Sequence, residues 1–222
     1  MKISIAICSY NRADKLKTLL ENFQQQILST SFAASQIGTV FELLLIDNNS
    51  SDKTCDMHSF SLDKAEFKYF LEVKPGLSSA RNRALKEFTG DLICFLDDDV
   101  KLSESFIASL LKISKRPIHE IGIIGARVSL EESLEQSSNF QKYALLSSSV
   151  FPVHDFGDKV QSYPFEYKSK SIENPIGACF LMSRNILASG IRFNEDFGLG
   201  ARKFAETLHY ILEESIPLKN VN

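Results

Sequence analysis

The sequence predicts an α/β protein with a doubly wound, mainly parallel sheet and helices on both faces. Within the first hundred residues, short continuous apolar runs alternate with segments whose apolar residues recur at helical spacing. Continuous apolar runs are typical of parallel strands covered on both faces, and parallel neighbours need helical crossovers. Clusters of polar residues follow three of the predicted strands, at the edge where such sheets bind ligands.

Four strands are expected in this half, at residues 3–8, 40–46, 67–73 and 92–96. The first connecting helix is indicated by apolar residues at spacings of three and four: Leu16, Leu19, Leu20, Phe23 and Ile27. Ser51 or Asp52 is expected to cap a short helix after the second strand. Another helix should begin at Ser78 or Ser79, and Gly90 is expected to end it.

Beyond residue 100 the pattern predicts a helix capped by Ser103, a strand at 121–128, a strand at 176–182, a short helix at 184–188 and a final helix at 202–214. Residues 130–173 have weak periodicity and many aromatic side chains. Some of these rings should complete the core, whereas Tyr163 and Tyr167 are candidates for lining a ligand-binding cleft.

Length and composition are typical of one domain, or of one domain with a small appended lobe. The 222 residues are 44% hydrophobic, which suffices for one core, and the net charge of −3 provides no basic field for nucleic acid. The four cysteines form no CxxC pair. Cys8 and Cys94 lie in apolar runs, where buried thiols in a reducing compartment are expected. The apolar runs are too short to span a bilayer, and residues 3–8 lack the features of a signal peptide. A cytoplasmic protein is therefore expected.

Three adjacent carboxylates, Asp97, Asp98 and Asp99, close the fourth strand. They repel one another and require a counter-charge. A hard divalent cation, Mg²⁺ or Mn²⁺, prefers such oxygen ligands and can also bind substrate phosphates. The alternative is a solvated acidic turn.

The other candidate binding residues also follow strands or begin helices. Asp47 ends the second strand, where it could accept hydrogen bonds from a ligand or from its own turn. Arg81 lies early in a helix and could meet a diphosphate, or could be an ordinary exposed arginine. Tyr10, Asn11 and Arg12 form a polar turn that could equally cap the first helix.

Four segments together give the sequence its resemblance to a known family. They are Ile7-Cys8-Ser9-Tyr10-Asn11-Arg12, Leu45-Ile46-Asp47-Asn48-Asn49-Ser50-Ser51-Asp52, Gly76-Leu77-Ser78-Ser79-Ala80-Arg81-Asn82 and Phe95-Leu96-Asp97-Asp98-Asp99. In this order and spacing they resemble glycosyltransferase family 2, over residues 1–130 and again around 175–200.

The resemblance implies a GT-A fold and an inverting transfer from a nucleotide diphosphate sugar, with UDP as the usual nucleotide. Asp99 would bind Mn²⁺ or Mg²⁺. The donor would contact the remaining candidates: Ser9, Tyr10, Arg12, Asp47, Arg81, Asp97 and Asp98. A single domain, 1–222, would have a nucleotide-sugar-binding half at 1–130 and an acceptor-side half at 131–222. The acceptor would be a saccharide or a lipid-linked molecule, which is compatible with peripheral association at the inner face of the membrane.

The C-terminal part departs from the family pattern. Where an acidic pair is usual, Phe204-Ala205-Glu206-Thr207 has one acid, so Glu206 is the candidate catalytic base. A surface glutamate is the alternative reading of Glu206. A nucleotide-sugar-binding protein without transfer activity is therefore a second hypothesis. A nucleotidyltransferase is disfavoured by the lack of a glycine-rich triphosphate loop near the N-terminus.

Overall fold

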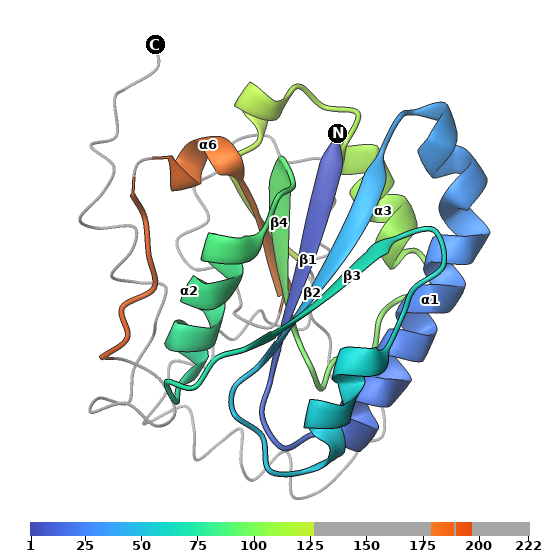
Figure 1. Cartoon of the computed structure of the whole chain (residues 1–222). Helices are drawn as coiled ribbons and strands as arrows, with labels where there is room; N and C mark the ends of the chain where they lie inside the picture. Colours follow the sequence, from blue (N-terminus) through green and yellow to red (C-terminus); the bar gives the residue numbers. More distant parts are fainter. Residues whose placement is uncertain (127–178, 189, 197–222) are drawn as a thin grey trace, which may run out of the picture. The chain divides into compact units, whose positions relative to one another are not determined.

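The computed structural model describes residues 1–126, 179–188 and 190–196. They form a six-stranded sheet of order β3-β2-β1-β4-β6-β5 (Figure 1). The strands are β1 Lys2–Ser9, β2 Val40–Asp47, β3 Glu66–Leu71, β4 Leu92–Asp97, β5 Ile123–Gly125 and β6 Cys179–Ser183. The helices are α1 Ala13–Gln36, η1 Lys53–Ser59, α2 Leu77–Glu87, α3 Phe106–Ile113, η2 Ile118–Glu120 and α6 Arg184–Leu187.

The four N-terminal strands are parallel, as predicted. β1 lies between β2 and β4 and pairs with both, while β3 pairs with β2. The two remaining strands are antiparallel: β6 runs against β4, and β5 runs against β6. The predicted strand at 121–128 is shorter within the described residues, Ile123–Gly125, and the prediction for 176–182 corresponds to Cys179–Ser183. The sheet is thus mainly parallel, with an antiparallel margin.

Helices cover both faces of this sheet, which confirms the doubly wound arrangement. Figure 1 shows α1 and α3 on one face and α2 and α6 on the other. Alternate strand residues face the two sides: Ile5 and Leu43 pack with α1 and α3, whereas Ala6 and Leu44 pack with α2 and α6. The apolar residues predicted to form the inner face of α1 are all buried: Leu16, Leu19, Leu20, Phe23 and Ile27.

Helix ends were predicted less accurately than helix faces. Asp52 caps η1 as expected, accepting a hydrogen bond from the Thr54 amide at 2.9 Å. The expected starts at Ser78 or Ser79 and at Ser103 are wrong, because α2 begins after Gly76 and α3 after Ser105, without side-chain caps. The predicted helix at 184–188 is α6. The predicted final helix and the aromatic stretch lie outside the described residues.

Gly90 does not end α2, which closes earlier at Phe88. The requirement for glycine comes instead from close packing against β1. A Cβ on Gly90 would lie 2.5 Å from the Ser4 Oγ and 2.8 Å from the Lys2 carbonyl oxygen. The chain can therefore enter β4 here only without a side chain.

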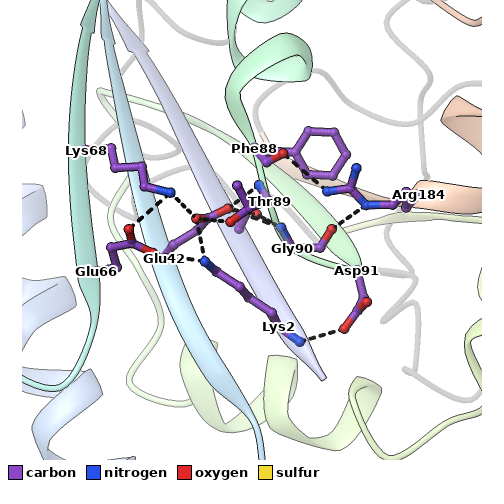
Figure 2. Close-up of polar contacts among 10 residues, drawn as sticks. Lys2, Glu42, Glu66, Lys68, Phe88, Thr89, Gly90, Asp91 and Arg184 are labelled. Atoms are coloured by element: carbon purple, nitrogen blue, oxygen red, sulfur yellow. Dashed lines mark hydrogen bonds and ion pairs between the residues drawn. The ribbon is translucent and has the colours of Figure 1, made fainter.

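A buried carboxylate joins the strands near their amino ends. Glu42 of β2 has no exposed surface, and Figure 2 shows it between Lys2 and Lys68 on one side and Thr89 on the other. The ammonium groups of Lys2 and Lys68 lie 2.9 Å and 3.0 Å from its Oε2. The Thr89 amide and hydroxyl each donate at 2.6 Å. The Ser4 hydroxyl completes the cluster with a further, short hydrogen bond to Glu42.

Among the described residues, no helix has the length and apolar character needed to cross a membrane.

Candidate active site

The register of the parallel strands brings the candidate residues to one edge of the sheet. Ser9 at the end of β1 pairs with Asp47 at the end of β2, and Cys8 pairs with Asp97 at the end of β4. Parallel strands in this register end at the same level, so side chains more than 80 positions apart in sequence become neighbours. The candidate side chains at the ends of β1, β2 and β4 thus lie beyond the carboxyl ends of the strands, where the sequence placed them.

Ser9 and Arg12 bind the carboxylates that follow β4. The Ser9 hydroxyl donates to Asp98 Oδ2 at 2.7 Å, and both side chains are buried. Arg12 Nη1 donates to Asp98 Oδ1 at 2.9 Å and to Asp99 Oδ2 at 2.6 Å. The charge of Asp98, and then that of Asp99, raises the pKa of Arg12 despite some desolvation. Part of the counter-charge that the acidic run needs is thus supplied by this arginine.

Arg81 binds the third carboxylate from the other side of the cluster. Its Nη2 lies 3.2 Å from Asp97 Oδ1, and its guanidinium carbon lies 5.5 Å and 5.6 Å from the ring centroids of Phe180 and Phe193. Burial raises the pKa of Asp97, and the positive charge of Arg81 opposes that rise. Arg81 is only 4% exposed, so the reading as an ordinary surface arginine is wrong.

Asp47 is fully buried, and its two oxygens have different partners. Oδ1 accepts a hydrogen bond from the Ser50 amide at 2.9 Å, which is the local turn bond considered above. Oδ2 accepts from the Tyr69 hydroxyl at 2.6 Å. Sequence reasoning missed Tyr69, since its proximity follows only from the pairing of β2 with β3.

Two asparagines hold the loops around these residues. Asn11 has a positive φ of 55°, and its side-chain oxygen accepts the Ser51 amide at 2.7 Å, which ties the first turn to the second. The Asn48 amide nitrogen donates to the carbonyl of Lys74 at 2.7 Å, and its oxygen accepts the Gly76 amide at 2.8 Å. The quoted segments contain both residues, but their side chains bind the chain itself.

A further contact joins α2 to the segment that follows α6. Asn82 bonds both backbone groups of Phe193, accepting from its N–H at 2.8 Å and donating to its C=O at 2.9 Å. It also donates to Glu195 at 2.8 Å, and Glu195 forms an ion pair with Lys74. These bonds hold Phe193 beside Arg81. Periodicity could not reveal them.

Among the described candidates, Tyr10 makes no side-chain hydrogen bond or ion pair with this cluster. Tyr10 has 58% of its surface exposed at the same loop. Glu206 lies outside the described residues, so its role stays a prediction. Seven of the candidates lie near one another at the carboxyl edge of the sheet: Ser9, Arg12, Asp47, Arg81, Asp97, Asp98 and Asp99.

The described residues contain no group of three or more His, Cys, Asp or Glu side chains arranged to hold a metal ion. Sites for Mg²⁺ or Mn²⁺ at nucleotides commonly use only one or two carboxylates and complete the coordination with phosphate oxygens. Asp99 fits that requirement, because 38% of its side chain is exposed at the sheet edge beside two other carboxylates. The donor set therefore fits a cation shared with a diphosphate, and does not form a separate cage.

Comparison with known proteins identifies the family to which the chain belongs. The profile of the family described as glycosyl transferase family 2 matches residues 4–190. The chain belongs to this family. The matched range includes β2 to β6, all of β1 except its first two residues, and every candidate residue except Glu206.

Two curated relatives of this family-2 chain are glycosyltransferases. An uncharacterized glycosyltransferase of Rickettsia conorii is 25% identical over 197 residues, covering 88% of this chain and 29% of the relative. The GalNAc(5)-diNAcBac-PP-undecaprenol beta-1,3-glucosyltransferase of Campylobacter jejuni is 24% identical, covering 88% of this chain and 56% of the relative. The chain thus spans between about a third and about a half of these relatives' lengths.

Solved glycosyltransferase structures share the fold. S. aureus TarS in complex with UDP-GlcNAc superposes with a TM-score of 0.51 at 17% identity, covering 87% of this chain and 49% of TarS. The mannosyltransferase PcManGT from Pyrobaculum calidifontis, in complex with GDP-Man and Mn²⁺, superposes with a TM-score of 0.54 at 16% identity. The match covers 86% of this chain and 47% of PcManGT. The expected GT-A fold is therefore confirmed.

Proposed function

We propose that this chain is a glycosyltransferase that moves a sugar from a nucleotide diphosphate donor to an acceptor hydroxyl, with inversion and with a divalent cation. The observation that carries the proposal is the cluster at the carboxyl edge, where three carboxylates meet two guanidinium groups. The fold neighbours carry nucleotide sugars of two kinds, UDP-GlcNAc and GDP-Man. UDP is the first donor nucleotide to test.

The reaction would be one in-line displacement at the anomeric carbon. The acceptor oxygen forms a bond to that carbon as the bond to the diphosphate oxygen breaks, and Glu206 takes the proton of the hydroxyl. When bound, Mn²⁺ or Mg²⁺ neutralises charge on the departing diphosphate. Ser9 and Arg12 hold Asp98 in place, while Arg81 holds Asp97. Fixing these groups in advance supplies part of the rate through positioning.

The acceptor is proposed to be a saccharide or a lipid-linked molecule. The Campylobacter relative is named for an undecaprenol-linked substrate, and a Serratia proteamaculans relative, 27% identical, is named for undecaprenyl phosphate. Such acceptors would place this chain at the cytoplasmic face of a membrane.

A second candidate function, donor binding without transfer, is favoured by the single acid in Phe204-Ala205-Glu206-Thr207. Calorimetry with UDP and Mn²⁺, paired with a UDP-sugar hydrolysis assay, separates the two functions. Binding together with hydrolysis supports the transferase, whereas binding without turnover across common UDP and GDP sugars supports the second candidate.

Replacing Asp99 with asparagine tests the metal assignment. Asp99→Asn should lose at least about 90% of Mn²⁺-dependent turnover, because a carboxylate charge at the cation is removed. Glu104→Gln is the matched control, since this exposed carboxylate follows in the same loop. Full Mn²⁺-dependent turnover in Asp99→Asn would reject Asp99 as the ligand.

A further inference from the structure

Arg12 binds the carboxylate group that a cation at Asp99 would need. Its Nη1 lies 2.6 Å from Asp99 Oδ2 and 2.9 Å from Asp98 Oδ1. We propose that Arg12 competes with the divalent cation for Asp99, so that cation binding moves its guanidinium off Asp99 while the contact with Asp98 is kept. This inference rests on the proposed function, in which Asp99 binds the cation.

The two contacts of Arg12 differ in how easily they can be exchanged. Asp98 is buried, with 7% of its side chain exposed, and its other oxygen is held by the Ser9 hydroxyl. Asp99 has 38% of its side chain exposed and has no second protein partner among the described residues. Water and ions can therefore reach Asp99 more readily, and the contact with Asp99 is the one that can open.

The backbone keeps Arg12 near the cluster when that contact opens. Its amide donates to the Thr54 hydroxyl at 3.3 Å, and its carbonyl accepts the Leu16 amide at 3.0 Å in the first turn of α1. The preceding Asn11 is tied to the second loop through Ser51. Only the side chain has to move, and its 45% exposure leaves room for another position.

Electrostatic repulsion opposes the simultaneous binding of the Arg12 guanidinium and the divalent cation at Asp99. A doubly charged ion on the Asp99 carboxylate would stand within a few ångströms of the guanidinium, where like charges repel. A nucleoside diphosphate changes this balance, because its oxygens are ligands for the cation and acceptors for the displaced arginine. Cation and nucleotide should therefore bind with positive coupling, and Arg12 should be one source of it.

Mn²⁺ titrations of the full chain, followed by the EPR signal of the free ion, measure this competition. Without nucleotide, Arg12→Gln should bind Mn²⁺ about fivefold more tightly than the wild type, the effect of releasing a partly exposed ion pair worth about 1 kcal/mol. Adding UDP should raise Mn²⁺ affinity by a smaller factor in Arg12→Gln than in the wild type. Arg12→Lys, which keeps the charge, should lie between the two.

Lys101→Gln is the matched control for net charge. Lys101 is exposed two residues after Asp99, and it makes no hydrogen bond or ion pair among the described residues. Its removal should change Mn²⁺ affinity less than about twofold, as expected of a screened surface charge. Equal tightening in Lys101→Gln and Arg12→Gln would show a general charge effect and overturn the competition.

Failure of the inference and failure of the proposed function give different results. If Asp99→Asn abolishes Mn²⁺ binding in the presence of UDP but Arg12→Gln binds Mn²⁺ like the wild type, only the competition is wrong. If Asp99→Asn binds Mn²⁺ and UDP as the wild type does, Asp99 is not the ligand and both proposals fall. Circular dichroism and the melting temperature of each variant establish that it is folded before the titrations are compared.

Discussion

Asp47 illustrates how a single side chain at this edge is prepared by its neighbours. It has no exposed surface, and both of its oxygens already accept hydrogen bonds, from the Ser50 amide and from the Tyr69 hydroxyl. Burial, and then the bond to Asp47, raises the pKa of Tyr69, so the phenol remains a donor. The hydrogen bond from Tyr69 fixes the orientation of the Asp47 carboxylate, and therefore the direction in which this carboxylate could accept a hydrogen bond from a nucleotide.

Tyr69→Phe should therefore affect both stability and nucleotide binding. Loss of the hydroxyl leaves Asp47 Oδ2 without its donor, which should lower the free energy of unfolding by about 1–2 kcal/mol. The dissociation constant for UDP, measured by calorimetry, should rise several-fold because Asp47 is no longer held.

Tyr10→Phe is the comparison variant for unfolding in urea. Tyr10 is 58% exposed, so its hydroxyl should contribute little to stability. Unchanged stability and unchanged UDP affinity in Tyr69→Phe would show that its hydroxyl does not hold Asp47.

At the scale of elements, Glu42 connects β1, β2, β3 and the turn before β4 through one carboxylate. Burial alone would raise its pKa. Hydrogen bonds from Ser4 and Thr89, together with the Lys2 ammonium, outweigh burial and hold the pKa of Glu42 well below its usual range. The neighbouring Arg184 also stabilises this end of the sheet by donating hydrogen bonds to the carbonyl oxygens of Gly90 and Phe88 (Figure 2). Four strands are thereby fixed at the edge opposite the candidate site.

The lowered pKa predicts how stability depends on pH. A carboxyl whose pKa is depressed by folding contributes stability above its unfolded pKa and loses it as pH falls toward the folded value. Glu42→Gln should lower the free energy of unfolding at pH 7 by about 3 kcal/mol relative to the wild type, because Lys2 and Lys68 lose a buried partner. That difference should shrink as pH falls below about 4.3, the usual pKa of glutamate.

Urea denaturation of the wild type and Glu42→Gln between pH 7 and pH 3 checks this dependence. Glu21→Gln, an exposed carboxyl on α1, is the control and should show little difference at any pH. A difference in unfolding free energy that stays constant down to pH 3 would contradict the lowered pKa.

The turn before β4 allows a second test of how the strands pack at this end of the sheet. Gly90→Ala should lower the melting temperature and reduce the free energy of unfolding by about 3 kcal/mol, because the new Cβ would clash with the backbone of Lys2 and Ser4. At Gly122 the nearest atom to a new Cβ is the Ile186 Cδ1 at 3.8 Å, so Gly122→Ala should be tolerated. Equal melting temperatures for the two variants would show that the Gly90 turn can relax away from β1.

For the whole molecule, donor binding and sugar transfer should be separable. The donor-side residues lie within 1–126, whereas the proposed base is Glu206. Glu206→Gln should keep the increase in melting temperature given by UDP with Mn²⁺, and lose transfer by about a hundredfold or more, as for loss of a general base.

Glu213→Gln is the control for Glu206→Gln, because both glutamates belong to one face of the predicted final helix. Comparable losses of transfer in the two variants would point to a structural role for the helix. Loss of UDP binding in Glu206→Gln would place that residue on the donor side.

The parallel strands, the inner faces of the helices and the edge at which the candidate side chains gather could all be predicted from the sequence. These features follow from local rules: apolar periodicity places Leu16 and Phe23 inward, and strand ends place Asp47 and Asp97 at one edge. The prediction that residues 1–222 form a single domain with two halves stays a prediction.

Which residues bind one another at that edge could be learned only from the three-dimensional structure. Arg12 meets Asp99 across 87 positions of sequence, Asn82 meets Phe193 across 111, and Tyr69 reaches Asp47 because β3 pairs with β2 in one register. Local periodicity records which side of a strand or helix is apolar, but it carries no information on register or on which distant polar groups face each other. Those pairings depend on the packing of all strands at once, because a hydrogen bond or ion pair requires positions fixed within a few tenths of an ångström.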